Sequence, residues 1–109
     1  MTLKELNERL ETIAGEIGVP CTYDFFREPQ APPFMIFRLE DRNDFYADNS
    51  NYKKIQPVRV IYVSEFADFE TEERIEDLLP TTYRKYAATW IESEKIYETD
   101  YEMEIILNG

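Results

Sequence analysis

The sequence predicts an α+β domain in which two helices pack on one face of a mostly antiparallel sheet. Three observations support this prediction. Two segments repeat apolar residues at helical spacing, the other apolar runs are short enough for strands, and the order of helix, strands, helix and hairpin lacks alternating βα units. At this length, residues 1–109 are expected to form one domain.

Apolar residues spaced three and four apart predict a first helix over residues 3–17. The stripe consists of Leu3, Leu6, Leu10, Ile13 and Ile17. Thr2 and Glu5 can form a capping box at its start, and Gly18 followed by Pro20 provides the stop. A coiled-coil seam has the same spacing, but about two heptads are too few, which favours a helix lying on a sheet.

Three apolar runs after this helix predict strands at residues 19–26, 34–39 and 58–63. The last run is rich in β-branched residues and lies between Pro57 and Ser64. Such a run is typical of a central strand that is buried on both faces.

Asp68 is expected to cap a second helix that ends before Pro80. The residues expected to share its apolar face are Phe69, Ile75, Leu78 and Leu79. Three glutamates in its first turn, Glu70, Glu72 and Glu73, complement the helix dipole. Glu70 is also spaced to pair with Arg74.

Two closing strands are expected at residues 83–91 and 95–107, joined by a turn near residues 92–94. In the last strand Tyr97, Thr99, Tyr101, Met103 and Ile105 alternate with Glu98, Asp100, Glu102 and Glu104. Two neighbouring carboxylates of this ladder could form an acid–base pair or hold a hard cation. No histidine, asparagine or glycine is interleaved, so we expect a solvated outer face without catalytic or metal-binding residues.

The composition narrows the functional class further. The chain carries 23 acidic and 12 basic residues, a formal charge of −11, which disfavours binding to phosphates or anionic lipid. We therefore expect no specific nucleic-acid binding and no membrane association. This charge can be interpreted as a means of solubility, as a surface to which nucleic acid must not adhere, or as a mimic of nucleic acid.

The cysteine and histidine content argues against an enzyme. Cys21 is the single cysteine and histidine is absent, so an internal disulfide, a cysteine-based zinc site and a conventional base for a serine nucleophile are not expected. We expect no catalytic residues and no cofactor, with Cys21 as a small buried apolar residue. Residues 2–9 contain no apolar run suited to a signal peptide or membrane span, which predicts a cytoplasmic origin.

The segment "NDFYADNSNYKKI", residues 43–55, lies in a connection longer than usual between two predicted strands. Residues 48–51 have turn chemistry, and a three-residue loop would place Tyr46 opposite Tyr52 in a small hairpin. Its aromatic residues could fold back onto the domain or reach a partner, and the sequence leaves both open. The candidate assembly-interface residues are Phe45, Tyr46, Asp48, Asn49 and Tyr52.

This segment, together with "PPFMIFRLE", "VRVIYVSE", "FETEERIEDLL" and "WIESEKIYETDYEMEII", resembles the small tail-completion or tail-to-head joining proteins of long-tailed phages and prophages of Gram-positive bacteria. The resemblance to these tail terminator-like proteins covers about residues 32–106. It implies an α+β fold, no enzymatic activity and no catalytic residues to carry over. It also implies assembly as a ring, possibly a hexamer, at the head-proximal end of the tail.

The partners implied are other copies of the chain, assembled on a template, with the tail tube protein and a head-connector protein. The location implied is the bacterial host cytoplasm during assembly and then the tail of the virion. A second hypothesis is an acidic DNA mimic that inhibits a nucleic-acid-binding protein, although the acids are divided between a helix and a strand. A carboxylate-metal hydrolase is the weakest, because its ligands would all come from one strand.

Overall fold

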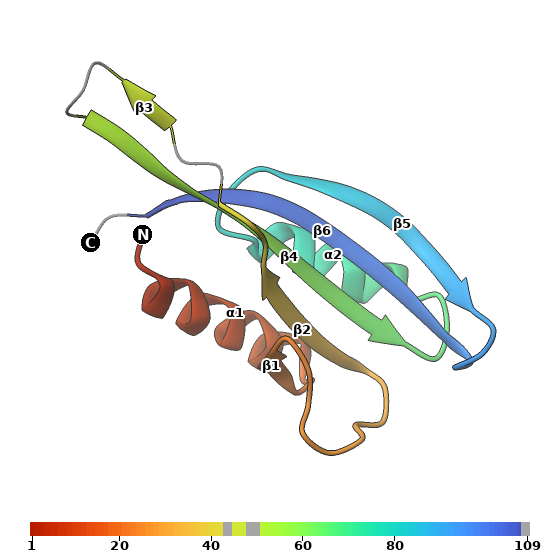
Figure 1. Cartoon of the computed structure of the whole chain (residues 1–109). Helices are drawn as coiled ribbons and strands as arrows, with labels where there is room; N and C mark the ends of the chain where they lie inside the picture. The colour runs from red at the N-terminus through yellow and green to blue at the C-terminus, as the bar shows by residue number, and fades with distance from the viewer. Residues whose placement is uncertain (43–44, 48–50, 108–109) are drawn as a thin grey trace.

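The computed structural model describes residues 1–42, 45–47 and 51–107, and of residues 45–47 and 51–53 it describes the backbone. It confirms the α+β class, with both helices on one face of the sheet (Figure 1). The elements are α1 (Leu3–Ile17), β1 (Cys21–Tyr23), β2 (Phe34–Leu39), β3 (Phe45–Ala47), β4 (Asn51–Ser64), α2 (Phe69–Leu78), β5 (Tyr83–Ile91) and β6 (Ile96–Leu107). No helix in the described ranges is long and apolar enough to cross a membrane.

The main path of the sheet has the order β1-β2-β4-β6-β5, and β3 pairs with β4 beside this path. All pairs are antiparallel except β1 with β2, which is parallel. β1 is much shorter than the predicted strand of residues 19–26. It ends because Asp24 adopts a left-handed backbone with φ of 66°, and its N–H donates to the Phe37 carbonyl at 2.7 Å.

α1 has the predicted bounds, because the signals at both of its ends are local. The Thr2 hydroxyl accepts a hydrogen bond from the Glu5 N–H at 3.1 Å, as a capping residue does. Gly18 ends the helix in the left-handed region, with φ of 75°. Most of the predicted stripe, including Leu6 and Leu10, is buried against the sheet.

α2 begins after the predicted cap, and the Asp68 carboxylate accepts from the Thr71 N–H at 3.3 Å. Its predicted apolar face is wrong in part. Ile75 is buried, but Phe69 and Leu78 are exposed, and Glu72 is buried in their place. Phe69 is exposed because it opens the helix at the end of the sheet, and Leu78 because it lies about 100° around the helix from the inward-facing Leu79.

The sheet is buried on its helix side and, at one end, also on its outer face, the side without helices. The main core joins Leu6, Leu10, Val60 and other residues under the two helices. A smaller cluster on the outer face consists of Ile36, Ile61 and Val63, with Phe26 and Phe34 against it. The central strand β4 is therefore buried on both faces over residues 60–63, and at Arg59 its outer face is only partly buried.

Candidate assembly interface

β3 and residues 51–53 of β4 pair to form a hairpin, which we call the arm. It extends past the sheet and helices at one end of the molecule, which measures 50 Å by 28 Å by 25 Å (Figure 1). Tyr46 lies opposite Tyr52, the pairing predicted for a three-residue loop. Of the other candidate interface residues, Phe45 lies on β3, while Asp48 and Asn49 lie outside the described residues.

The arm is continuous with the central strand of the sheet. β4 begins at Asn51 rather than at the predicted Val58, and β6 pairs with it as far as Lys54. The predicted start of the central strand is therefore wrong, whereas the small hairpin expected within the long connection is present. Pro57 is the cause of the error, since proline usually marks the limit of a central strand, whereas here it lies within β4 opposite Glu104.

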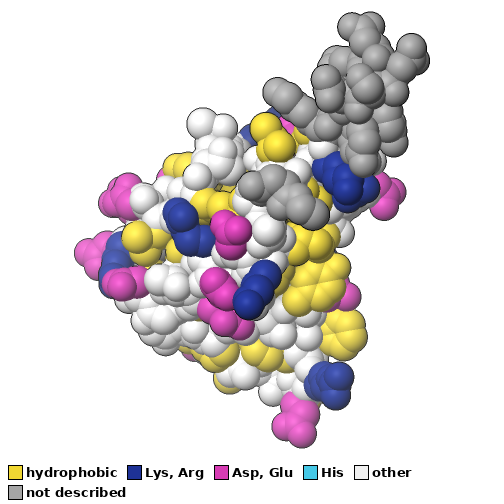
Figure 2. All heavy atoms as spheres, turned by 90° about the vertical axis from the view of Figure 1, so that its left-hand side faces the viewer, with side chains coloured by type: hydrophobic (Ala, Val, Ile, Leu, Met, Phe, Trp, Pro, Cys, Tyr) yellow, Lys and Arg dark blue, Asp and Glu magenta, His cyan; other side chains and the backbone are white. Residues whose placement is uncertain are grey.

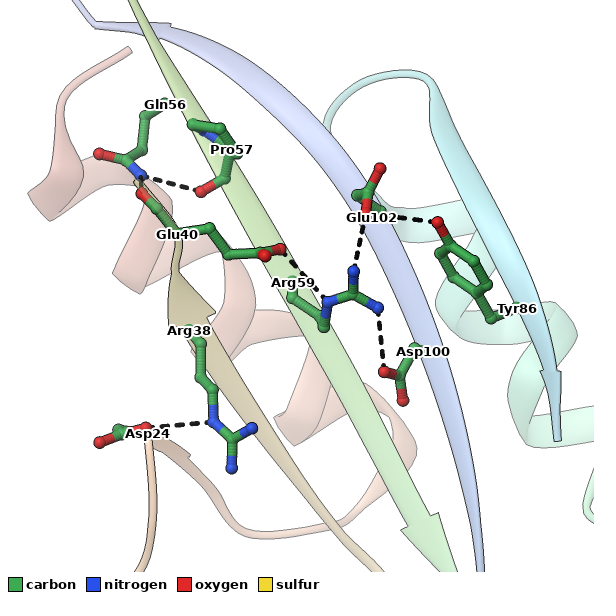
Figure 3. A network of polar contacts seen from close by, with 9 residues as sticks. All are labelled: Asp24, Arg38, Glu40, Gln56, Pro57, Arg59, Tyr86, Asp100 and Glu102. Carbon is green, nitrogen blue, oxygen red and sulfur yellow. Dashed lines mark hydrogen bonds and ion pairs between the residues drawn. The ribbon is translucent and has the colours of Figure 1, made fainter. Parts of the chain in front are cut away.

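A side chain supplies the hydrogen bond that Pro57 cannot make. The Glu40 N–H donates to the Pro57 carbonyl at 3.1 Å, and an ordinary residue at position 57 would donate back to the Glu40 carbonyl. Nε2 of Gln56 makes this bond instead at 2.8 Å, and it also donates to the Pro57 carbonyl at 2.8 Å (Figure 3). The buried Gln56 amide thus secures the sheet at the root of the arm.

Arg59 organises the outer face of the sheet beside this root. Its guanidinium lies 3.2 Å from Glu40, 3.1 Å from Asp100 and 2.7 Å from Glu102, each measured from nitrogen to carboxylate oxygen (Figure 3). The Tyr86 ring lies 5.1 Å from the guanidinium carbon, and its hydroxyl donates to Glu102 at 3.4 Å. One cation therefore links β4, β5, β6 and the chain that follows β2.

The carboxylate ladder of β6 lies on this outer face, as predicted, but it is not uniformly solvated. Asp100 and Glu102 are half-buried and paired with Arg59, whereas Glu104 is exposed. Burial, followed by the charge of Asp100, raises the pKa of Glu98. Within the described part of the chain, no group of three or more cysteine, aspartate or glutamate side chains could hold a metal ion.

A second polar cluster lies on the helix side, between α2 and β5. Nζ of Lys85 is 2.9 Å from a Glu72 carboxylate oxygen and 3.0 Å from one of Glu76. The Tyr101 hydroxyl donates to Glu76 at 2.9 Å, and the Tyr83 hydroxyl donates to it at 3.3 Å. Glu72 is only 2% exposed, so Lys85 compensates a carboxylate that is removed from water.

The ionisation of this cluster favours anchoring over reactivity. Burial raises the pKa of Glu76, but hydrogen bonds from Lys85 and Tyr101 outweigh it and hold the pKa below its ordinary value. Burial lowers the pKa of Lys85, and its bonds to Glu72 and Glu76 reverse this and raise it. Burial and the bond to Glu76 raise the pKa of Tyr101. The cluster therefore joins Lys85 and two tyrosine hydroxyls to the carboxylates of α2, and it fixes α2 to β5 and β6.

This cluster was not predicted from the sequence, because Glu72 was expected only to complement the helix dipole. Arg74, which was expected to pair with Glu70, instead donates to the Glu16 carbonyl of α1 at 3.0 Å. The missed signal was periodicity: Glu72, Ile75 and Glu76 occupy one face of the helix. Cys21 is half-buried, and burial followed by the charge of Glu11 raises its thiol pKa to about 11.

Three aromatic side chains are exposed at the end of the sheet opposite the arm. Phe66 is 63%, Phe69 68% and Trp90 41% exposed, and we call these residues the distal patch. β4 ends at Ser64, which lies opposite Tyr97 of β6, and Tyr97 lies opposite Trp90. The Trp90 and Tyr97 ring centroids are 4.9 Å apart, so Trp90 packs on the sheet while part of its side chain stays exposed.

Charges of both signs are dispersed over the face that Figure 2 shows, without a broad basic surface. On the outer face, a hollow next to the exposed Phe25 is lined by Phe26, Phe34, Ile36 and neighbouring polar residues. This hollow is open and shallow, and the small outer-face cluster forms its floor.

Comparison with known proteins gives a fold relationship. No protein-family model matches the sequence, and no curated protein matches it. A chain in a solved structure described as "Virion of native gene transfer agent (GTA) particle" has a TM-score of 0.69 to this chain at 15% identity. The similarity covers 99% of this chain and 96% of that one, so the two share a fold over nearly their whole lengths.

Proposed function

We propose that this protein is a structural component of a phage-like virion, which completes the tail or joins it to the head as a ring at the head-proximal end of the tail. The observation that carries the proposal is the fold shared with a chain of a gene transfer agent virion over nearly the whole of both chains. The position in the tail is supported by the resemblance of residues 32–106 to tail-completion proteins.

The shape of the molecule supports assembly with other subunits. A ring needs two different surfaces on each subunit, one for each neighbour. The arm lies at the start of β4, and the distal patch lies beside the end of the same strand, so each subunit has two different surfaces outside its main core. In this proposal the arm contacts a neighbouring copy or the tail tube protein, and the ring meets a head-connector protein on its other side.

The charge fits a ring through which DNA passes. A subunit of charge −11 does not grip phosphates, so DNA can move past it. Six such subunits would gather about −66, and this self-repulsion opposes spontaneous closure. We therefore propose that the purified protein is a monomer or small oligomer, and that the ring assembles on the tail tube as a template.

The proposed role is not enzymatic, and it requires no cofactor. The carboxylate ladder is the most regular acidic array of the sequence, and its Asp100 and Glu102 already bind Arg59. The same pairing weakens the alternative of a DNA mimic, because a mimic must offer unpaired carboxylates in place of phosphates. Arg59 neutralises part of the carboxylate ladder, which a DNA mimic would need as free negative charge.

Deletion of the gene from an inducible prophage tests the function. We expect electron microscopy of the lysate to show filled heads and separate tails, with tail length or tail ends altered. Complementation with the intact gene should restore joined particles. Normal, correctly joined virions from the deletion would refute the proposed function.

A further inference from the structure

We propose that the distal patch is the surface on which the arm of a second copy of this chain docks, so that copies join head to tail. The inference rests on the proposed ring function, for which it names the contact between subunits. It concerns the described residues Phe66, Phe69 and Trp90 as the receiving surface.

The two surfaces are the opposite ends of one strand. β4 starts in the arm at Asn51 and ends beside the distal patch at Ser64. At 3.2–3.4 Å per residue, the ends of this strand are about 40 Å apart. They cannot meet within one molecule, but they can meet between two. A contact between different surfaces leaves one free arm and one free patch on each pair, which permits a third copy to join.

The distal patch has the chemistry of a docking surface. Large exposed aromatic side chains that gather in one region mark interaction sites. Phe66, Phe69 and Trp90 all lie close to where β4 and β5 end. Trp90 is held in place by its contact with Tyr97 and by a hydrogen bond from Nε1 to Glu92 at 2.6 Å. Phe66 follows Ser64, whose hydroxyl donates to the Phe66 carbonyl at 2.7 Å. The patch is therefore presented on ordered backbone.

Charge selects the arm as the occupant. The segment of residues 64–73, which carries Phe66 and Phe69, contains Glu65, Asp68, Glu70, Glu72 and Glu73 and no basic residue. Residues 42–54, which include the arm, contain three basic and two acidic residues, a net charge of +1 in a chain of −11. Because the whole chain carries −11, another surface of a second copy would on average bring like charge to the patch. The arm brings aromatic residues together with Lys53 and Lys54.

Cysteine cross-linking tests this contact in a Cys21→Ser background. One variant carries Tyr52→Cys on the arm, and the other carries Phe69→Cys in the patch. The control replaces the second variant with Phe25→Cys, which is 66% exposed and lies in the loop before β2, beside the outer-face hollow. The variants carry different affinity tags, and heterodimers are counted after mild oxidation at equal concentrations.

We expect the disulfide between positions 52 and 69 to form about tenfold faster than the control disulfide, because docking raises the effective concentration of the thiols. Adding Phe66→Ser to the patch variant should reduce this rate to the control level. Equal rates for the disulfide between positions 52 and 69 and for the control disulfide between positions 52 and 25 would overturn the inference. Equal cross-linking rates together with unjoined tails from the prophage deletion would rule out this contact and leave the proposed function in place. Normal virions from the deletion would refute the proposed function itself.

Discussion

Nε2 of Gln56 donates a hydrogen bond to the Glu40 carbonyl at 2.8 Å, at the place where Pro57 has no N–H to offer. This relationship makes a proline compatible with the interior of a central strand. It also locates the point at which β2 ends and the chain turns toward the arm. On the β2 side of the arm root, an amide side chain thus replaces one bond of the backbone ladder, while the ladder to β6 continues as far as Lys54.

We predict that Gln56→Leu destabilises the protein by about 0.5–1.5 kcal/mol, because it removes the part-buried hydrogen bond to the Glu40 carbonyl. Pro57→Ala restores the backbone N–H, so the double variant Gln56→Leu with Pro57→Ala should lose clearly less than Gln56→Leu alone. Urea unfolding of the wild type, both single variants and the double variant measures this coupling. Strict additivity of the two single effects would show that the amide does not replace the proline N–H.

Features that depend on neighbouring residues could be predicted from the sequence, whereas features that depend on contacts between distant residues could not. α1 was predicted with its bounds because its cap, its stripe and its terminal glycine all lie within one local segment. The pairing of Tyr46 with Tyr52 followed from the turn chemistry between them. In contrast, Pro57 could be placed within a strand only by knowing that Gln56 and Glu40 lie together, and these are sixteen positions apart.

The candidate site shows the same division between local and distant information. The aromatic hairpin could be identified from residues 43–55 alone, and its backbone has the predicted register. The polar clusters could not, because Arg59 meets Glu102 only through the pairing of β4 with β6. Lys85 likewise reaches Glu72 only after the sheet brings β5 under α2.

We predict that Arg59→Met lowers stability by about 1–3 kcal/mol, because it leaves half-buried Asp100 and Glu102 close together without a cation. Arg38→Met is the matched control. Arg38 pairs with Asp24 at 3.1 Å, but both side chains are about half exposed, so its loss should cost under about 1 kcal/mol. Urea midpoints at low and moderate salt check both values. Equal costs for the two variants would contradict a structural role for the Arg59 network.

Lys85→Met should destabilise more strongly, by about 3–5 kcal/mol, because Glu72 would remain buried without its cation. Adding Glu72→Leu removes the stranded charge, so the double variant should recover most of this loss. Thermal unfolding followed by circular dichroism measures the recovery. If Glu72→Leu gave no recovery in the Lys85→Met background, the burial of the Glu72 charge would not be the cause.

Glu76 should make stability depend on acid. Its pKa in the folded protein lies below the ordinary value of 4.5, so the folded state binds fewer protons here than the unfolded chain. Its contribution is therefore present above pH 4.5 and is lost as the pH falls through the folded-state pKa. Glu76→Gln should cost about 1–3 kcal/mol at pH 7, and this difference from wild type should shrink below about pH 4. Urea unfolding at several pH values measures it.

Glu98 is the control of opposite sign. Its folded-state pKa is raised by burial and by Asp100, so it favours folding below pH 4.5, and this contribution is lost as the pH rises through the folded-state pKa. Glu98→Gln should therefore be at least as stable as wild type at pH 7. A loss of stability at pH 7 in this variant would contradict the sign of the assigned shift.

Replacement of Tyr46 and Tyr52 together by serine should separate folding from assembly. The two residues are opposite each other in the register of the arm, which extends past the sheet and helices (Figure 1), so the change should cost under about 1 kcal/mol. The same change removes both tyrosine rings of the proposed contact with a neighbouring subunit. We therefore expect a normal melting curve for the purified variant, but separate heads and tails in lysates of a prophage that carries it. Lys4→Ser and Arg9→Ser, on the exposed side of α1, provide a control double variant that should yield joined, infectious particles. Normal infectivity of the tyrosine variant would show that its two rings are not needed for assembly.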